Sequence, residues 1–155
     1  MYQFTNSWFL DGAKDVWDCL IPQLSPARIL EIGSFEGACI CYLIEKMGAK
    51  HSLDIHSIDT WEGSIEHKDQ GFEATVMSDV ENRFKHNISI AHKNAENPVN
   101  ITIHKGLSHL KLAELINDGY ENFFDLIYVD GSHQAPDVIL DAVLTDYGRA
   151  KLASG

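Results

Sequence analysis

Three acidic residues stand where an apolar stretch of the chain gives way to glycine or polar residues. Glu31 lies in "RILEIGSFEG", Asp59 ends "LDIHSID" and Asp130 ends "FDLIYVD". Short apolar runs that stop at turn residues are typical of buried parallel strands. The carboxyl ends of such strands share one edge of the sheet, where open α/β folds bind ligands. The three carboxylates therefore predict a site for a ligand with positive charge or hydroxyl groups.

Two glycines follow Glu31, and their spacing restricts the kind of ligand. Gly33 lets the chain turn sharply off the strand, and Gly37 lets the next helix pack closely on the sheet, although any strand-to-helix turn favours glycine. A dinucleotide motif has its second glycine where this chain has Phe35. Phe35 would crowd a pyrophosphate and Glu36 would repel it. Nicotinamide and flavin dinucleotides are therefore disfavoured, and the P-loop motif is absent from the sequence.

A cofactor without phosphates and with positive charge suits this pattern better. S-adenosylmethionine carries a sulfonium, an ammonium group and a ribose diol. Glu31 would attract the charge, and Asp59 stands where a carboxylate can accept hydrogen bonds from both ribose hydroxyls. The alternative for Asp59 is an aspartate that caps a loop.

The elements that position these residues alternate along the chain. Strands are predicted over 27–33, 53–59, 100–106 and 123–131. Helices are predicted over 7–22, 37–48, 71–94, 107–119 and 135–148. This alternation predicts an α/β fold with right-handed crossovers, a doubly wound and mostly parallel sheet with helices on both faces.

The chain is predicted to form a single domain over 1–155, with a helical lead-in (1–24), a core (25–147) and a tail (148–155). Its 12 basic and 23 acidic residues give a net charge of −11, which disfavours nucleic acid and anionic membranes as partners. Three cysteines without a CxxC motif indicate neither a disulfide framework nor a zinc ribbon. No signal peptide or membrane span is evident, so a cytoplasmic protein acting on a small molecule is expected.

The motifs also carry a family resemblance. "ILEIGSFEG" resembles the first motif of class I methyltransferases, and "HSIDTWEG" resembles their acidic second-strand motif. "FDLIYVDGSHQAPDVILDAV" is similar to the fourth-strand segment of the branch that reads YVDGSH. The resemblance covers about residues 25–147 and implies a Rossmann-like fold that uses S-adenosylmethionine for methyl transfer, with an oxygen atom of a small molecule as acceptor.

The resemblance assigns roles to individual residues. Glu31 would lie near the methionine ammonium group, and Asp59 would hold the ribose. The methionine end would be lined by Gly33, Ser34, Phe35 and Gly37. Trp61 would flank the adenine, unless it packs in the core beneath the loop. Gly106 and Ser108 would border the adenine, although a plain turn explains them as well.

At the reacting end the resemblance implies two catalytic residues. Asp130 would face the donor sulfur and the acceptor, and in oxygen-directed relatives an aspartate here binds a divalent cation such as Mg²⁺. His133 would be the general base, with a loop or helix-capping histidine as the alternative. The polar loop 62–71 is long enough to act as a lid that carries His67 towards the acceptor.

The pattern is incomplete after the fourth strand and its helix. A complete fold of this family has seven strands, and the end of this chain has no apolar run for a fifth. The expected strand order is 3-2-1-4 with the fourth strand at an edge, which invites pairing with a second copy. A truncated cofactor-binding module without turnover is therefore the alternative function, and a nicotinamide oxidoreductase is disfavoured by Phe35 and Glu36.

Overall fold

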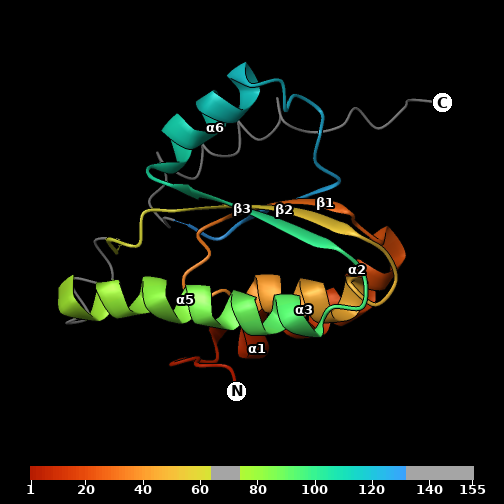
Figure 1. Ribbon diagram of the computed structural model, residues 1–155, viewed down its shortest axis with the longest axis horizontal. Helices are drawn as coiled ribbons and strands as arrows, with labels where there is room; N and C mark the ends of the chain where they lie inside the picture. The colour runs from red at the N-terminus through yellow and green to blue at the C-terminus, as the bar shows by residue number, and fades with distance from the viewer. Residues whose placement is uncertain (64–73, 132–155) are drawn as a thin grey trace.

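A computed structural model of the protein describes residues 1–63 and 74–131. Its sheet contains four parallel strands in the order β3-β2-β1-β4, as the sequence predicts (Figure 1). The strands are β1 (Arg28–Ile32), β2 (Leu53–Asp59), β3 (Val99–Lys105) and β4 (Leu126–Val129). The predicted helix 135–148 and the tail lie outside the described residues, as does most of the predicted lid.

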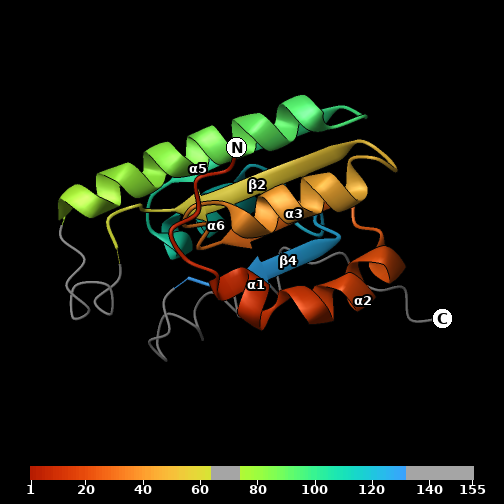
Figure 2. The same ribbon diagram turned by 90° about the horizontal axis from the view of Figure 1, so that it is seen from below.

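Helices lie on both faces of the sheet, which confirms the doubly wound arrangement. They are α1 (Trp8–Gly12), α2 (Lys14–Leu24), α3 (Ala38–Met47), α5 (Ala74–Asn94) and α6 (Ser108–Asn117). α6 covers one face, and α3 and α5 cover the other together with α1 and α2 (Figures 1 and 2). The single opening helix predicted over 7–22 is in fact two helices, which break near Gly12, a residue of low helix propensity.

The side chains of β1 alternate between the two layers of the core. Ile29 belongs to the cluster that packs under α3 and α5, and Leu30 and Ile32 belong to the cluster under α6. Glu31 therefore shares a face with Ile29 and points towards α3, because successive strand residues point to opposite faces. The acid sits within the hydrophobic layer of the larger cluster.

The two outer strands differ from the central pair. β3 is more exposed than the central pair, as predicted, but its exposure does not alternate strictly, because Ile101 and Thr102 are both half-buried and Ile103 is exposed. β4 was expected to be buried on both faces, but three of its residues are half-buried and Val129 is 37% exposed. The reason is its position, since within the described sheet β4 pairs with β1 alone.

Main-chain hydrogen bonds continue past the strands and align the loops that follow them. The Gly33 amide donates to the Ile58 carbonyl at 2.9 Å, and the Gly106 amide donates to the Asp59 carbonyl at 3.0 Å. The Asp130 amide donates to the carbonyl at the end of β1 at 2.8 Å. The loops that leave all four strands therefore begin at one edge of the sheet. In the described part of the chain, no helix is long and apolar enough to cross a bilayer.

Candidate cofactor site at the carboxyl edge of the sheet

Gly33 and Gly37 shape the turn between β1 and α3, and both need to be glycine. Their φ angles are +86° and +79°, in the left-handed region. A Cβ atom at Gly33 would lie 2.3 Å from the Asp130 carbonyl oxygen, and one at Gly37 would lie 2.9 Å from the Phe84 ring. The turn is therefore packed tightly against Asp130, just after β4, on one side and against α5 on the other, whereas Gly37 was expected to let the next helix pack closely on the sheet.

Glu31 is the most unusual group at this edge. It is only 1% exposed, and its Oε2 atom has no hydrogen-bond partner among the described residues. Burial raises the pKa of its carboxyl to about 7, although hydrogen bonds from Cys39 and Ser34 oppose the rise. An isolated buried carboxylate is costly unless something compensates it. Glu31 therefore has an unfilled requirement for a donor or a positive charge.

Asp59 ends β2 and is held by backbone amides. Its Oδ2 atom accepts from the Phe35 amide at 2.9 Å, and its Oδ1 atom accepts from the Trp61 amide at 2.7 Å. Burial raises the pKa of Asp59, and these backbone bonds lower it in part. A carboxylate has about four lone-pair sites. The Ser34 and Thr60 amides also bond to this carboxylate, so a ribose hydroxyl would share its oxygens with four backbone donors.

Trp61 requires a correction, because the structure favours the core-packing alternative. The side chain is 3% exposed, and its ring lies 4.8 Å from that of Phe84. Its indole Nε1 donates to the Phe35 carbonyl at 2.9 Å. Trp61 thus supports the turn from beneath and does not present an open ring face to adenine.

The remaining residues assigned to the cofactor lie around the same edge. Ser34 is buried, and its hydroxyl lies 2.7 Å from that of Ser57 on β2. Gly106 follows β3 with a φ of +151°, and Ser108 begins α6. Their position beyond Asp59 agrees with an adenine border, but the structure gives a plain turn as complete an explanation.

Asp130 follows β4 at the opposite side of the turn from Asp59. It is exposed, and Tyr128 donates its hydroxyl proton to Asp130 Oδ2 at 3.2 Å. The Tyr128 ring packs edge-on against Trp17 of α2 with centroids 4.8 Å apart. The sequence analysis missed Tyr128, although its place two residues before Asp130 on a strand puts both side chains on one face. His133 and His67 lie outside the described residues.

Glu36 differs from its expected role. It was expected to repel phosphates at the turn, yet its side chain is 2% exposed and forms an ion pair with Arg83, with Nε and Oε1 2.6 Å apart. Thr5 donates to it as well, from both its amide and its hydroxyl. The evidence against a dinucleotide therefore rests on Phe35, whose φ of +47° is strained for a residue with a side chain.

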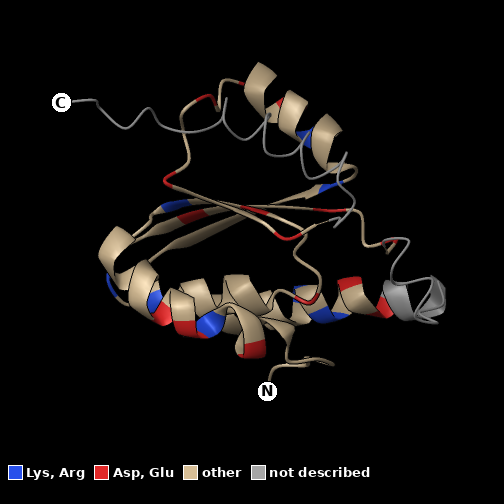
Figure 3. Cartoon of the chain, turned by 180° about the vertical axis from the view of Figure 1, so that it is seen from behind, with Lys and Arg blue, Asp and Glu red and all other residues tan. Residues whose placement is uncertain are grey.

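The charge around the edge is mostly negative. Glu31, Asp59 and Asp130 are close enough for the latter two to raise the pKa of the first. In the view of Figure 3, the Lys and Arg positions are scattered over the described helices and strand ends. The edge suits a cationic ligand, and the described residues contain no group of three that could hold a metal ion.

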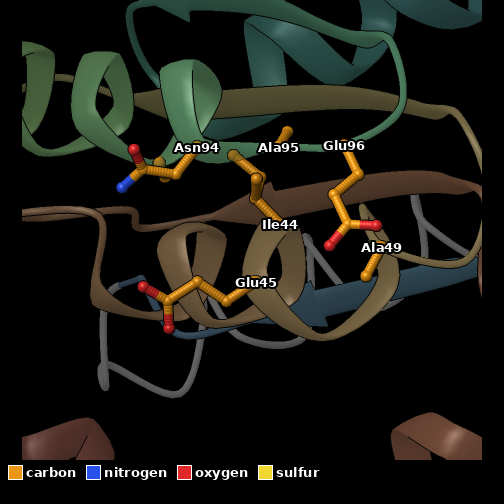
Figure 4. A pocket seen from close by; sticks show the side chains of 7 residues that line it. Ile44, Glu45, Ala49, Asn94, Ala95 and Glu96 are labelled. Carbon is orange, nitrogen blue, oxygen red and sulfur yellow. The ribbon is translucent and has the colours of Figure 1, made fainter.

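A separate pocket lies at the far end of the same helices. It is lined by Ile44, Glu45, Ala49, Ala91, Asn94, Ala95 and Glu96 (Figure 4). These residues come from the last turns of α3 and α5 and the loops after them, whereas the glycine turn leads into the first turn of α3. The pocket is therefore not part of the candidate site.

Comparison with known proteins agrees with this geometry. A family model described as a methyltransferase domain matches residues 30–150. A solved O-methyltransferase from Bacillus cereus in complex with SAH is similar in fold, with a TM-score of 0.52 and 21% sequence identity. The match covers 83% of this chain and 49% of that chain, so this chain spans about half the length of that O-methyltransferase. None of the curated proteins that were compared matches. The fold is the Rossmann-like methyltransferase fold, and the chain belongs to the methyltransferase-domain family.

Proposed function

We propose that the chain transfers the methyl group of S-adenosylmethionine to an oxygen atom of a small molecule. The observation that carries this proposal is the buried Glu31 carboxylate, whose Oε2 atom has no partner among the described residues. Its position beside a glycine turn fits the ammonium group of the cofactor, because a cationic donor would satisfy both its charge and its open lone pairs.

Different residues of the edge bind different parts of the cofactor. Glu31 takes the positive end, beside a turn whose two glycines let the backbone pack closely on Asp130 and Phe84. Asp59 accepts from the ribose hydroxyls while the backbone amides of the turn hold its carboxylate in place. A site preorganised in this way loses little free energy to reordering when the cofactor binds.

Methyl transfer needs the acceptor to be held in line with the methyl group. The acceptor oxygen forms a bond to the methyl carbon, the carbon–sulfur bond breaks, and sulfur keeps the electron pair. We propose that Asp130 lies on the acceptor side, with its carboxylate oriented by Tyr128. The proton of the acceptor hydroxyl passes to a base, for which His133, three residues after Asp130, is the candidate.

The resemblance also implies a divalent cation beside the acceptor. Among the described residues, Asp130 alone stands where such an ion would meet the acceptor, and one carboxylate does not make a metal site. No step is therefore assigned to a cation. A second copy of the chain, paired along the outer edge of β4, is likewise proposed as a partner.

The second candidate function is cofactor binding without turnover. It needs only the cofactor edge, whose Glu31 and Asp59 carboxylates lie among the described residues, whereas His133 lies outside them. The two candidates share the cofactor edge and differ in what happens at Asp130.

Turnover separates the two. The chain would be incubated with methyl-labelled S-adenosylmethionine and a panel of hydroxylated small molecules, with Mg²⁺ or with EDTA, and labelled product would be counted. Asp130→Asn is the test variant, and Asp125→Asn, at the opposite end of β4, is the matched control for folding. Product that is lost in Asp130→Asn and retained in the control supports methyl transfer. Binding of the cofactor with no product from any acceptor supports the binding module.

A further inference from the structure

The N-terminal segment, residues 1–7, is fastened to the body of the protein beside the cofactor turn. Figure 2 shows it passing the start of α3 on its way to α1. Gln3 forms two hydrogen bonds with the Asn87 side chain of α5, its amide donating at 2.7 Å and its carbonyl accepting at 3.1 Å. Asn87 is completely buried, and it also donates to the Glu36 carbonyl at 2.9 Å. One side chain of α5 thus joins the segment to the turn.

Glu36 makes the second and stronger connection. Its carboxylate accepts from the Thr5 amide at 2.7 Å, from the Thr5 hydroxyl at 2.8 Å and from Arg83 Nε at 2.6 Å. Two of these three donors belong to the N-terminal segment. A buried carboxylate that loses donors becomes costly, because its desolvation is no longer compensated. The position of Glu36 therefore depends on Thr5.

Glu36 lies within the cofactor turn, next to Phe35. The main chain of Phe35 is held on its other side, where its amide donates to Asp59 and its carbonyl accepts from Trp61. The ring of Trp8, which directly follows the N-terminal segment, packs on the Phe35 ring with centroids 5.3 Å apart. Phe35 has a left-handed φ that costs free energy, so this conformation persists only where surrounding contacts fix it.

We propose that Thr5 and Glu36 are positioning residues for the cofactor. They touch no part of it and act by fixing the left-handed conformation at Phe35, which in turn aligns the amide bound to Asp59. The N-terminal segment is thus a working part of the site, although it is distant in sequence from every cofactor motif. This inference rests on the proposed function, because the ligand whose affinity it controls is S-adenosylmethionine or its product.

Three variants test the inference. Thr5→Val removes the hydroxyl bond to Glu36 and keeps the side-chain shape and the amide bond. Thr5→Ser keeps the hydroxyl and removes only the methyl group. Tyr2→Phe is the matched control, because it removes a different side-chain bond of the segment, from the Tyr2 hydroxyl to Glu45 at 2.6 Å, which does not involve the turn.

S-adenosylhomocysteine would be titrated into each variant by calorimetry, with melting temperatures measured without ligand. We expect Thr5→Val to bind about 3- to 10-fold more weakly, since one hydrogen bond to a charged group is worth about 1 kcal/mol or more. Thr5→Ser and Tyr2→Phe should bind within about 2-fold of the parent chain, by the same arithmetic. A readout without ligand is hydrogen exchange at the Phe35 amide, which should be faster in Thr5→Val than in Tyr2→Phe.

The outcomes distinguish this inference from the function on which it rests. If the parent chain binds and Thr5→Val binds equally well with unchanged exchange at Phe35, the positioning role is overturned and the proposed function stands. If Tyr2→Phe weakens binding as much as Thr5→Val, the effect is general loosening of the segment, and the specific role of Thr5 is overturned. If the parent chain does not bind at all, the proposed function is contradicted and the inference is overturned with it.

Discussion

Replacement of Glu31 by glutamine should make the protein more stable and a poorer binder. The change keeps the shape of the side chain and one carbonyl oxygen for the donors at Ser34 and Cys39. It removes the charge that burial disfavours. A buried charge that costs stability at the edge where ligands bind indicates a functional role.

The size of the stability effect follows from the pKa. The carboxyl titrates near 4.5 in an unfolded chain and at about 7 in the folded protein. Each pKa unit corresponds to about 1.4 kcal/mol, so the ionised Glu31 costs about 3 kcal/mol of unfolding free energy at pH 8. Between pH 7 and 4.5 the folded state binds a proton that the unfolded state does not, and the cost disappears as pH falls.

Urea unfolding at pH 8 and pH 5 measures the free-energy cost of the ionised Glu31 carboxylate directly. Glu31→Gln should exceed the parent chain by about 3 kcal/mol at pH 8 and by less than about 1 kcal/mol at pH 5. Its affinity for S-adenosylhomocysteine at pH 8 should fall about 10- to 100-fold, the worth of a charge-assisted hydrogen bond. Equal stability at pH 8, or a difference that does not change with pH, would refute the reasoning about burial. Unchanged affinity would refute the role assigned to Glu31.

Three further predictions concern other parts of the fold. His56 and His104, whose ring nitrogens are 2.9 Å apart, have pKa values lowered chiefly by burial, which favours the neutral form of both rings in the folded protein. Their contribution to the unfolding free energy should therefore fall as pH drops below about 6.5, opposite in sign to that of Glu31, and the stability of His104→Asn relative to the parent chain should rise over that range in urea titrations. Gly33→Ala should cost at least about 2 kcal/mol, because its Cβ would meet a backbone oxygen at a left-handed φ, whereas Gly12→Ala, with open space around it, should cost nothing. Pairing along β4 predicts a dimer mass by light scattering, and a monomer at micromolar concentration would exclude it.

Much of the fold was predictable because it depends on local pattern. The bounds of β2 match the predicted 53–59, since apolar residues and turn residues mark both ends. The alternation of elements predicted the parallel, doubly wound sheet, and the resemblance to class I methyltransferases implied the strand order. The glycines of the turn were also predictable, because backbone geometry at such a position excludes other residues.

The parts that could not be predicted depend on long-range contacts. A tryptophan at position 61 is compatible with either a ligand contact or a core position. Its contact with Phe84 on α5 places it in the core. From the sequence alone Glu36 is expected to be an exposed anion, because its partners Thr5 and Arg83 lie 31 and 47 residues away along the chain. A signal for either would have required knowledge of which helix faces the turn.

The most direct test of the central claim is a calorimetric titration of the 155-residue chain with S-adenosylhomocysteine at pH 8, repeated with Asp59→Ala and with Asp54→Ala. Asp54 lies on the same strand and is bonded to Asn100 at the far end from the turn, so it controls for loss of a carboxylate. We expect binding by the parent chain and by Asp54→Ala, and at least a tenfold loss in Asp59→Ala. A folded parent chain that does not bind, or equal binding by all three proteins, would contradict the cofactor site described above.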